Sequence, residues 1–218
     1  MAVPYILRMI AEGEHQQQDF KMRVDDARKI ARTLVAFANS DGGRLLVGVK
    51  DNGTVCGVRP DEEYHMLETA AQQHCRPALA LEVQLWKSDH RTVMEVRVSP
   101  SANRPHQAEV EPGEWKAFIR RGDQNLPAPG VLLEVWRHGE ELRPWHYTHT
   151  EREMSLFREL ASHPEGLSLS ALIRAVRMPR PAMVRLLARC IRWKLVELDF
   201  RQDQAIYRLV RGTGNFAG

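Results

Sequence analysis

The chain has 218 residues, of which 27% are charged and 43% are hydrophobic, as in a folded globular protein rather than a disordered one. No apolar run approaches the ~20 residues of a transmembrane helix, so we expect no membrane segment. The N-terminus lacks a charged leader followed by a long apolar core, which argues against a secretory signal. Cys56, Cys75 and Cys190 are too scattered for a disulfide framework, so we expect a cytoplasmic protein.

The charge is distributed unevenly along the chain, although its formal net value is only +3. From Thr150 to the end there are 12 Lys and Arg against 7 Asp and Glu, whereas the preceding part holds 19 basic and 21 acidic residues. This asymmetry indicates an anionic partner for the C-terminal third. A basic surface that is merely solvated would give the same count.

The first part of the chain predicts a helix, a glycine turn and two strands. Ile30, Leu34 and Phe37 recur on one helical face. Gly42 and Gly43 follow, and paired glycines supply the positive φ that ends a helix and reverses the backbone. The apolar run 45–49 then predicts a strand. Asp51-Asn52-Gly53 is typical of a tight hairpin turn, which predicts a second strand over 54–58.

The remaining elements of this part mix helices with antiparallel hairpins. We expect a short helix or strand over 3–11, a helix over 60–76, strands over 81–86 and 93–98, a loop over 100–113, a strand over 115–120 and a helix over 131–137. Mixed order of this kind predicts an α+β fold rather than a doubly wound parallel sheet. We place this first domain at residues 1–140.

From Thr150 the pattern becomes helical. Thr150 and Glu153 have the spacing of a capping box, in which the side chain of each residue accepts a hydrogen bond from the backbone amide of the other. Ser168 is placed to cap a second helix over 169–176. A third helix is expected over 182–193, followed by strands over 195–200 and 205–210. Three helices followed by a two-stranded wing resemble a winged helix-turn-helix domain, which we place at residues 150–211.

The N-terminal part also resembles a known family. The stretch 36–43, Ala-Phe-Ala-Asn-Ser-Asp-Gly-Gly, followed by Leu-Val-Gly-Val-Lys-Asp at 46–51, is similar to the signature of the AlbA_2 domain, also called the Schlafen AlbA or divergent AAA-4 domain. Residues 14–21 resemble the family's acidic opening, and 118–128 resemble its closing strand and turn. The resemblance covers roughly residues 10–137 and implies a nucleic-acid-binding fold.

Basic residues concentrate around the third C-terminal helix. Between positions 174 and 194 there are seven basic residues and no acidic ones: Arg174, Arg177, Arg180, Arg185, Arg189, Arg192 and Lys194. Arg185, Arg189 and Arg192 share the face opposite the apolar stripe. In a helix-turn-helix domain this helix enters the major groove, so we expect Arg180, the face arginines and Lys194 to contact DNA. The alternative is a solvated basic face on a module used for dimerisation.

The first domain offers further candidate contacts. We expect an exposed loop at Asn39, Gly42, Gly43 and Arg44 whose backbone amides face a phosphate. Lys21, Arg120 and Arg121 are expected to add positive charge to the same surface. The alternative is that the glycines only end a helix and begin a strand.

Enzymatic alternatives have less support in the sequence. No Walker A loop is present, which argues against an ATPase, and we expect no cofactor. The Schlafen resemblance implies a metal-dependent ribonuclease alternative with Glu14, Asp19 and Asp51 as the carboxylates. A hairpin role for Asp51 and structural roles for the other two compete with it. His146 and His149 lack further ligands at metal-binding spacing, so we expect no metal site.

The sequence therefore predicts a DNA-binding transcriptional regulator. One winged helix on a single half-site gives limited affinity, so we expect a homodimer. RNA remains an alternative ligand for the first domain, and a protein-interaction adaptor is an alternative for the whole chain.

Overall fold

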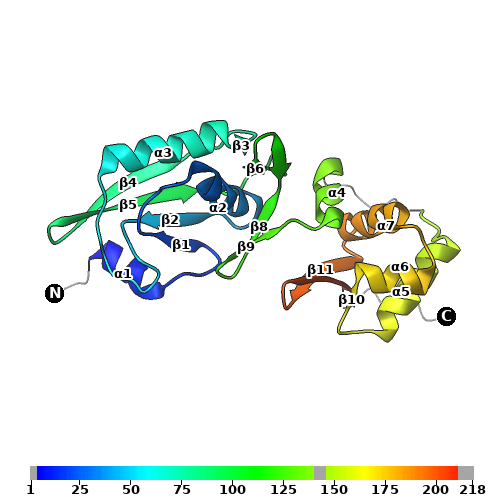
Figure 1. The fold of residues 1–218 in the computed structure, drawn as a ribbon. Coiled ribbons are helices and arrows are strands. Elements are labelled where there is room, and N and C mark those ends of the chain that lie inside the picture. Colours follow the sequence, from blue (N-terminus) through cyan, green and yellow to red (C-terminus); the bar gives the residue numbers. More distant parts are fainter. Residues whose placement is uncertain (1–3, 140–145, 211–218) are drawn as a thin grey trace. The chain divides into compact units, whose positions relative to one another are not determined.

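The computed structural model describes residues 4–139 and 146–210. The chain divides into two compact units, Met1–Ala128 and Pro129–Gly218 (Figure 1). The elements of the first unit are α1 (Tyr5–Glu12), β1 (Gln18–Lys21), α2 (Ala27–Asn39), β2 (Gly43–Val47), α3 (Pro60–Gln73), β3 (Cys75–Arg76), β4 (Glu82–Ser88), β5 (Arg91–Val98), β6 (Gln107–Glu111), β7 (Glu114–Lys116), β8 (Phe118–Arg121) and β9 (Gln124–Pro127). Helices and mostly antiparallel strands confirm the predicted α+β class.

A four-stranded sheet in the order β1-β2-β5-β4 forms the centre of the first unit. β1 pairs with β2 in parallel, and the other neighbours are antiparallel. Successive residues of β2 enter different cores: Leu45 and Val47 pack with α2 and α3, whereas Leu46 packs with α1. β2 is therefore buried on both faces over residues 45–47, which explains the apolar run in that part of the strand.

Helix α2 ends at the predicted glycine turn and begins after a capping aspartate. The Asp26 carboxylate accepts hydrogen bonds from the amides of Arg28 and Lys29, which caps the N-terminus. Its apolar face, which includes Leu34 and Phe37, is fully buried against the sheet. This packing fixes the end of α2 directly beside the start of β2.

Two strand predictions and one loop prediction in this unit are wrong. Residues 54–58 form only an isolated bridge between Val49 and Val55, since Gly48 and Gly57 both adopt positive φ and interrupt the ladder. The predicted loop over 100–113 contains β6, which pairs with β3 and β7 and buries Ala108. The predicted strand over 115–120 is divided into β7 and β8, which belong to different sheets.

The second unit contains α4 (Gly130–His138), α5 (Glu151–Ser162), β10 (Leu167–Ser168), α6 (Leu169–Val176), α7 (Arg180–Arg192), β11 (Val196–Arg201) and β12 (Gln204–Leu209). The three strands form an antiparallel sheet in the order β10-β12-β11. The predicted capping box at Thr150 and the predicted cap at Ser168 are confirmed.

The boundary between the units differs from the predicted one. Helix α4 packs against α7, and its Val131 is fully buried in the core of the second unit (Figure 1). The division therefore falls after Ala128. The predicted limits at residues 140 and 211 lie outside the described residues. No helix in the described ranges is long and apolar enough to cross a membrane.

Candidate nucleic-acid interface

The Gly-Gly turn has a structural role that its geometry explains. Gly42 adopts φ +71°, and its amide donates to the Phe37 carbonyl at 3.0 Å, which ends α2. A Cβ atom at Gly43 would lie 2.4 Å from Cδ1 of the buried Phe37 ring. Both glycines are therefore required by the close approach of the backbone to its own core.

Asn39 is buried and does not belong to an exposed loop. Its Nδ2 donates to the carbonyls of His106 and Phe118 at 2.8 and 2.9 Å, and its Oδ1 accepts from the His106 amide at 2.8 Å. These bonds join the end of α2 to two segments that lie far along the chain. The expectation of a phosphate-facing Asn39 is wrong, because both polar atoms of its side chain form hydrogen bonds to backbone groups of the same unit.

Arg120 is also buried, with 3% of its surface exposed. Its guanidinium donates to the Asp19 carboxylate, the Gln18 carbonyl and the Asn125 side chain, each at 3.1 Å. It also lies 5.3 Å from the centre of the Phe37 ring. The expectation that Arg120 adds charge to a nucleic-acid surface is wrong, because removing it from these partners would leave a carboxylate buried with one fewer donor.

The three carboxylates of the ribonuclease alternative are not brought together. Asp19 is held between Arg120 and Lys21, whose Nζ lies 2.7 Å from the carboxylate. Glu14 accepts from the Phe20 amide at 2.9 Å, whereas Asp51 is exposed in its turn. Among residues 4–139 and 146–210, no group of three His, Cys, Asp or Glu side chains is arranged to hold a metal ion.

Glu14 has a perturbed environment nevertheless. Burial is the largest influence and raises the pKa of its carboxyl, and the nearby Asp19 carboxylate raises it further. The Phe20 amide opposes this shift. The pair is thus a structural acid cluster joined to the arginine network, without the third carboxylate that the resemblance implied.

Arg44 lies beside an arginine that sequence analysis missed. Arg44 and Arg97 are directly opposite on β2 and β5, and both donate to the Tyr5 hydroxyl, at 3.3 and 2.9 Å. The hollow next to them, of about 430 Å³, is also lined by Asp41 and Glu82. The charges of this hollow are therefore balanced. Only the pairing of the strands could have revealed Arg97.

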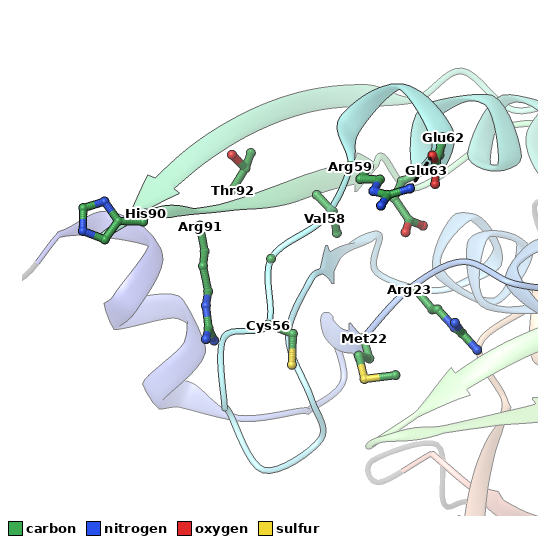
Figure 2. A pocket seen from close by; sticks show the side chains of 11 residues that line it. Met22, Arg23, Cys56, Val58, Arg59, Glu62, Glu63, His90, Arg91 and Thr92 are labelled. Atoms are coloured by element: carbon green, nitrogen blue, oxygen red, sulfur yellow. Dashed lines mark hydrogen bonds and ion pairs between the residues drawn. The ribbon is translucent and has the colours of Figure 1, made fainter.

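A second hollow in this unit, of about 460 Å³, is shown in Figure 2. Arg23, Arg59 and Arg91 line it together with two glutamates, Glu62 and Glu63. Arg59 pairs with Glu62 at 3.1 Å, Arg91 donates to the Val55 carbonyl, and Glu63 accepts from the Val24 amide at 2.6 Å. Most of these charged groups already have a hydrogen-bond or ion-pair partner in the protein. The hollow is therefore neither strongly positive nor strongly negative.

The expected basic residues of the second unit occupy different environments. Arg180 and Arg185 are exposed on α7, and Lys194 is exposed just after it. Arg192 is partly buried. Arg189 donates to the Glu153 carboxylate and lies over the rings of Tyr147 and Trp193. In the first unit, Arg121 is exposed at the end of β8.

Glu153 is a residue whose role the sequence revealed only in part. Its carboxylate accepts from the Thr150 amide at 2.8 Å, as the capping box predicts, but also from Arg189 and from the Tyr147 hydroxyl at 2.7 Å. Burial by itself raises the pKa of this carboxyl, but the hydrogen bonds from Tyr147 and Thr150 and the charge of Arg189 lower it below its ordinary value. Arg189 is therefore paired with the buried Glu153 carboxylate.

The geometry defines the N-terminal unit as an α+β domain in which a helix, a Gly-Gly turn and a buried strand are held by an internal polar network. A sequence model of the family described as "Schlafen, AlbA_2" matches residues 14–129, more than half of the chain. The chain belongs to the Schlafen AlbA_2 family.

Two solved structures are similar to the chain. The DIP2311 protein of Corynebacterium diphtheriae is 18% identical with a TM-score of 0.44, and the match covers 73% of this chain and 32% of that one. The N-terminal domain of a Nitrosomonas europaea protein, described as related to the ATP-dependent DNA helicase RecG, is 24% identical with a TM-score of 0.40; the match covers 66% of this chain and 96% of that one. The chain thus spans about a third of the C. diphtheriae protein. No curated protein matches the sequence.

Proposed function

We propose that this protein binds nucleic acid, and that it is a DNA-binding transcriptional regulator. Membership of the Schlafen AlbA_2 family supports a nucleic-acid role for the first unit. The second unit has the element order of a winged helix-turn-helix domain, with α5, α6 and α7 followed by the β11-β12 hairpin. In such a domain the third helix lies in the major groove.

The observation that carries the proposal is the environment of the α7 arginines. Arg180 and Arg185 are exposed, and no acidic residue occurs between positions 174 and 194. The side of α7 opposite Arg185, which includes Met183 and Leu187, is buried in the core, and Arg180 is the first residue of the helix. Exposed arginines at the first residue and on the outer side of a rigidly packed helix fit the phosphates and guanine edges of a duplex.

Two further parts of the proposal concern assembly and location. A homodimer would place two α7 helices on two half-sites and raise the affinity. All three cysteines are free thiols, and Cys75 and Cys190 are buried, which supports a reducing compartment such as the cytoplasm.

A fluorescence-anisotropy titration tests this function. The full chain is titrated into random duplex DNA and into structured RNA over a range of salt, with and without Mg²⁺ or Mn²⁺. We expect duplex binding that weakens steeply with salt and leaves the probe intact. Arg180→Gln should weaken it, whereas Arg158→Gln, which removes the same charge from an exposed position on α5, should have little effect.

Other outcomes would overturn the proposal in distinct ways. Metal-dependent shortening of the RNA would favour the ribonuclease alternative, although Asp51 does not join Glu14 and Asp19. Absence of binding to both nucleic acids would favour the adaptor. Equal losses in the Arg180 and Arg158 variants would show that α7 is not the contact surface.

A further inference from the structure

The second unit contains a hollow whose lining is dominated by positive charge. It has a volume of about 320 Å³ and lies between the N-terminal turn of α5 and the exposed side of α7. Arg152 comes from α5, and Arg185 and Arg189 come from α7. The other lining residues are Thr150, Glu153, Met178, Ala182 and Leu186. Two helices thus bring three guanidinium groups around one space.

The single carboxylate in the lining does not neutralise this space. Glu153 has only 2% of its side chain exposed, and its oxygens are engaged by Tyr147, Thr150 and Arg189. Its negative charge is therefore balanced by Arg189 within the fold. Arg152 and Arg185 make no ion pair within the described ranges and are both exposed. The hollow retains a surplus of two positive charges.

The Glu153–Arg189 pair also gives the hollow a fixed inner wall. Arg189 lies over the rings of Tyr147 and Trp193, with its guanidinium carbon 5.7 and 5.2 Å from their centres. The capping box holds the first turn of α5 in place.

We infer that this hollow binds a phosphate group, and that in the proposed function, on which this inference rests, the group belongs to the nucleic-acid backbone. Arg152 and Arg185 are the two side chains that contact it. Guanidinium groups suit phosphate because their N–H donors form paired hydrogen bonds with its oxygens. Arg152 was not among the residues expected from the sequence, and it acts beside α7 rather than in the groove. Arg189 serves to balance Glu153 and is not a base-reading residue.

The test uses the full chain and a matched pair of variants on α5. Arg152→Gln removes a charge from the hollow, whereas Arg158→Gln removes the same charge from an exposed position outside it. For a lost phosphate contact we expect the negative slope of log affinity against log salt to become shallower by about 0.9, and the affinity for duplex DNA to fall roughly 5- to 10-fold at about 0.1 M salt. Arg158→Gln should leave both unchanged. Circular dichroism confirms that the variants are folded.

A second arm separates a backbone phosphate from a free anion. Thermal unfolding is followed with inorganic phosphate and with sodium chloride at matched ionic strength, without nucleic acid. A rise in Tm that is specific for phosphate and lost in Arg152→Gln supports a site that also accepts the free ion. No such rise, together with the expected loss of DNA affinity, supports a site that requires the nucleic-acid backbone.

The two proposals fail separately. If the wild-type chain binds DNA and the two variants are indistinguishable, the phosphate site is overturned and the DNA-binding function stands. If the wild-type chain binds no nucleic acid, the proposed function is overturned. The hollow is then judged by inorganic phosphate alone: a Tm rise that depends on Arg152 supports a phosphate site, and its absence overturns it.

Discussion

Arginines that look alike in the sequence have opposite roles in the structure. Arg120 and Arg189 are each joined to a buried carboxylate, Asp19 or Glu153. Arg152 and Arg185 are exposed and form no ion pair within the described part of the chain. Only the second kind has donors available to an anionic ligand. A count of positive charges therefore overstates the binding surface, and each arginine has to be judged by its partners.

At the same scale, Gly43→Ala is expected to destabilise the first unit by about 1–3 kcal/mol, because the new methyl would overpack the Phe37 ring. That ring is fully buried, so it has little room to move away from the 2.4 Å approach. The free energy of unfolding in urea measures the effect. Gly130→Ala is the control, since its Cβ would meet nothing within 4 Å. Equal unfolding free energies for wild type and Gly43→Ala would contradict the packing argument.

At the scale of the elements, β6 is connected to two helices through Glu109. Its carboxylate accepts from the Gly113 amide at 2.9 Å, from the His74 ring at 2.8 Å and from Arg28 on α2 at 3.3 Å. These hydrogen bonds, that of Gly113 first, lower the pKa of Glu109 from 4.5 to about 2. No apolar pattern in the sequence predicts β6, and a polar residue, Glu109, joins this strand to the rest of the fold.

This shift has a consequence for stability against pH. Since the pKa of Glu109 is lower in the folded state than in the unfolded state, its contribution is complete above pH 4.5 and is lost as the pH falls towards about 2. Glu109→Gln should be less stable than wild type at neutral pH, and the difference should shrink over that range. Urea unfolding at several pH values measures it. The exposed Glu111→Gln is the control, and a constant difference for Glu109→Gln would contradict the assignment.

At the scale of the whole molecule, the chain consists of two units with separate hydrophobic cores. The first helix of the second unit, α4, contributes Val131 and Val135 to the second core. A fragment that begins at Pro129 therefore contains a complete core. A fragment that begins at residue 146 lacks this helix and exposes the apolar surface that it covers.

We expect the fragment 129–218 to unfold cooperatively and to be more stable than 146–218, with burial of Val131 alone contributing about 1.5–3 kcal/mol. Thermal unfolding followed by circular dichroism compares the two. In the longer fragment, Val131→Ala should lose part of the difference, whereas Arg158→Gln, at an exposed position on α5, should change little. If the two fragments have the same Tm, α4 is not part of the second core.

The sequence alone determined the features that depend on neighbours a few residues apart. The periodicity of α2, the caps at Thr150 and Ser168, and the Gly-Gly turn all involve local hydrogen bonds or helical spacing, so they could be predicted. The family resemblance was carried by the same short stretches.

The tertiary structure decided the rest, because the deciding contacts join distant parts of the chain. β6 is a strand because it pairs with β3, and Asn39 is buried because the carbonyls of residues 106 and 118 reach it. Arg120 is paired with the buried Asp19 carboxylate, and Arg189 is paired with the buried Glu153 carboxylate. Burial and pairing of charged groups depend on these long-range contacts, which no local pattern records.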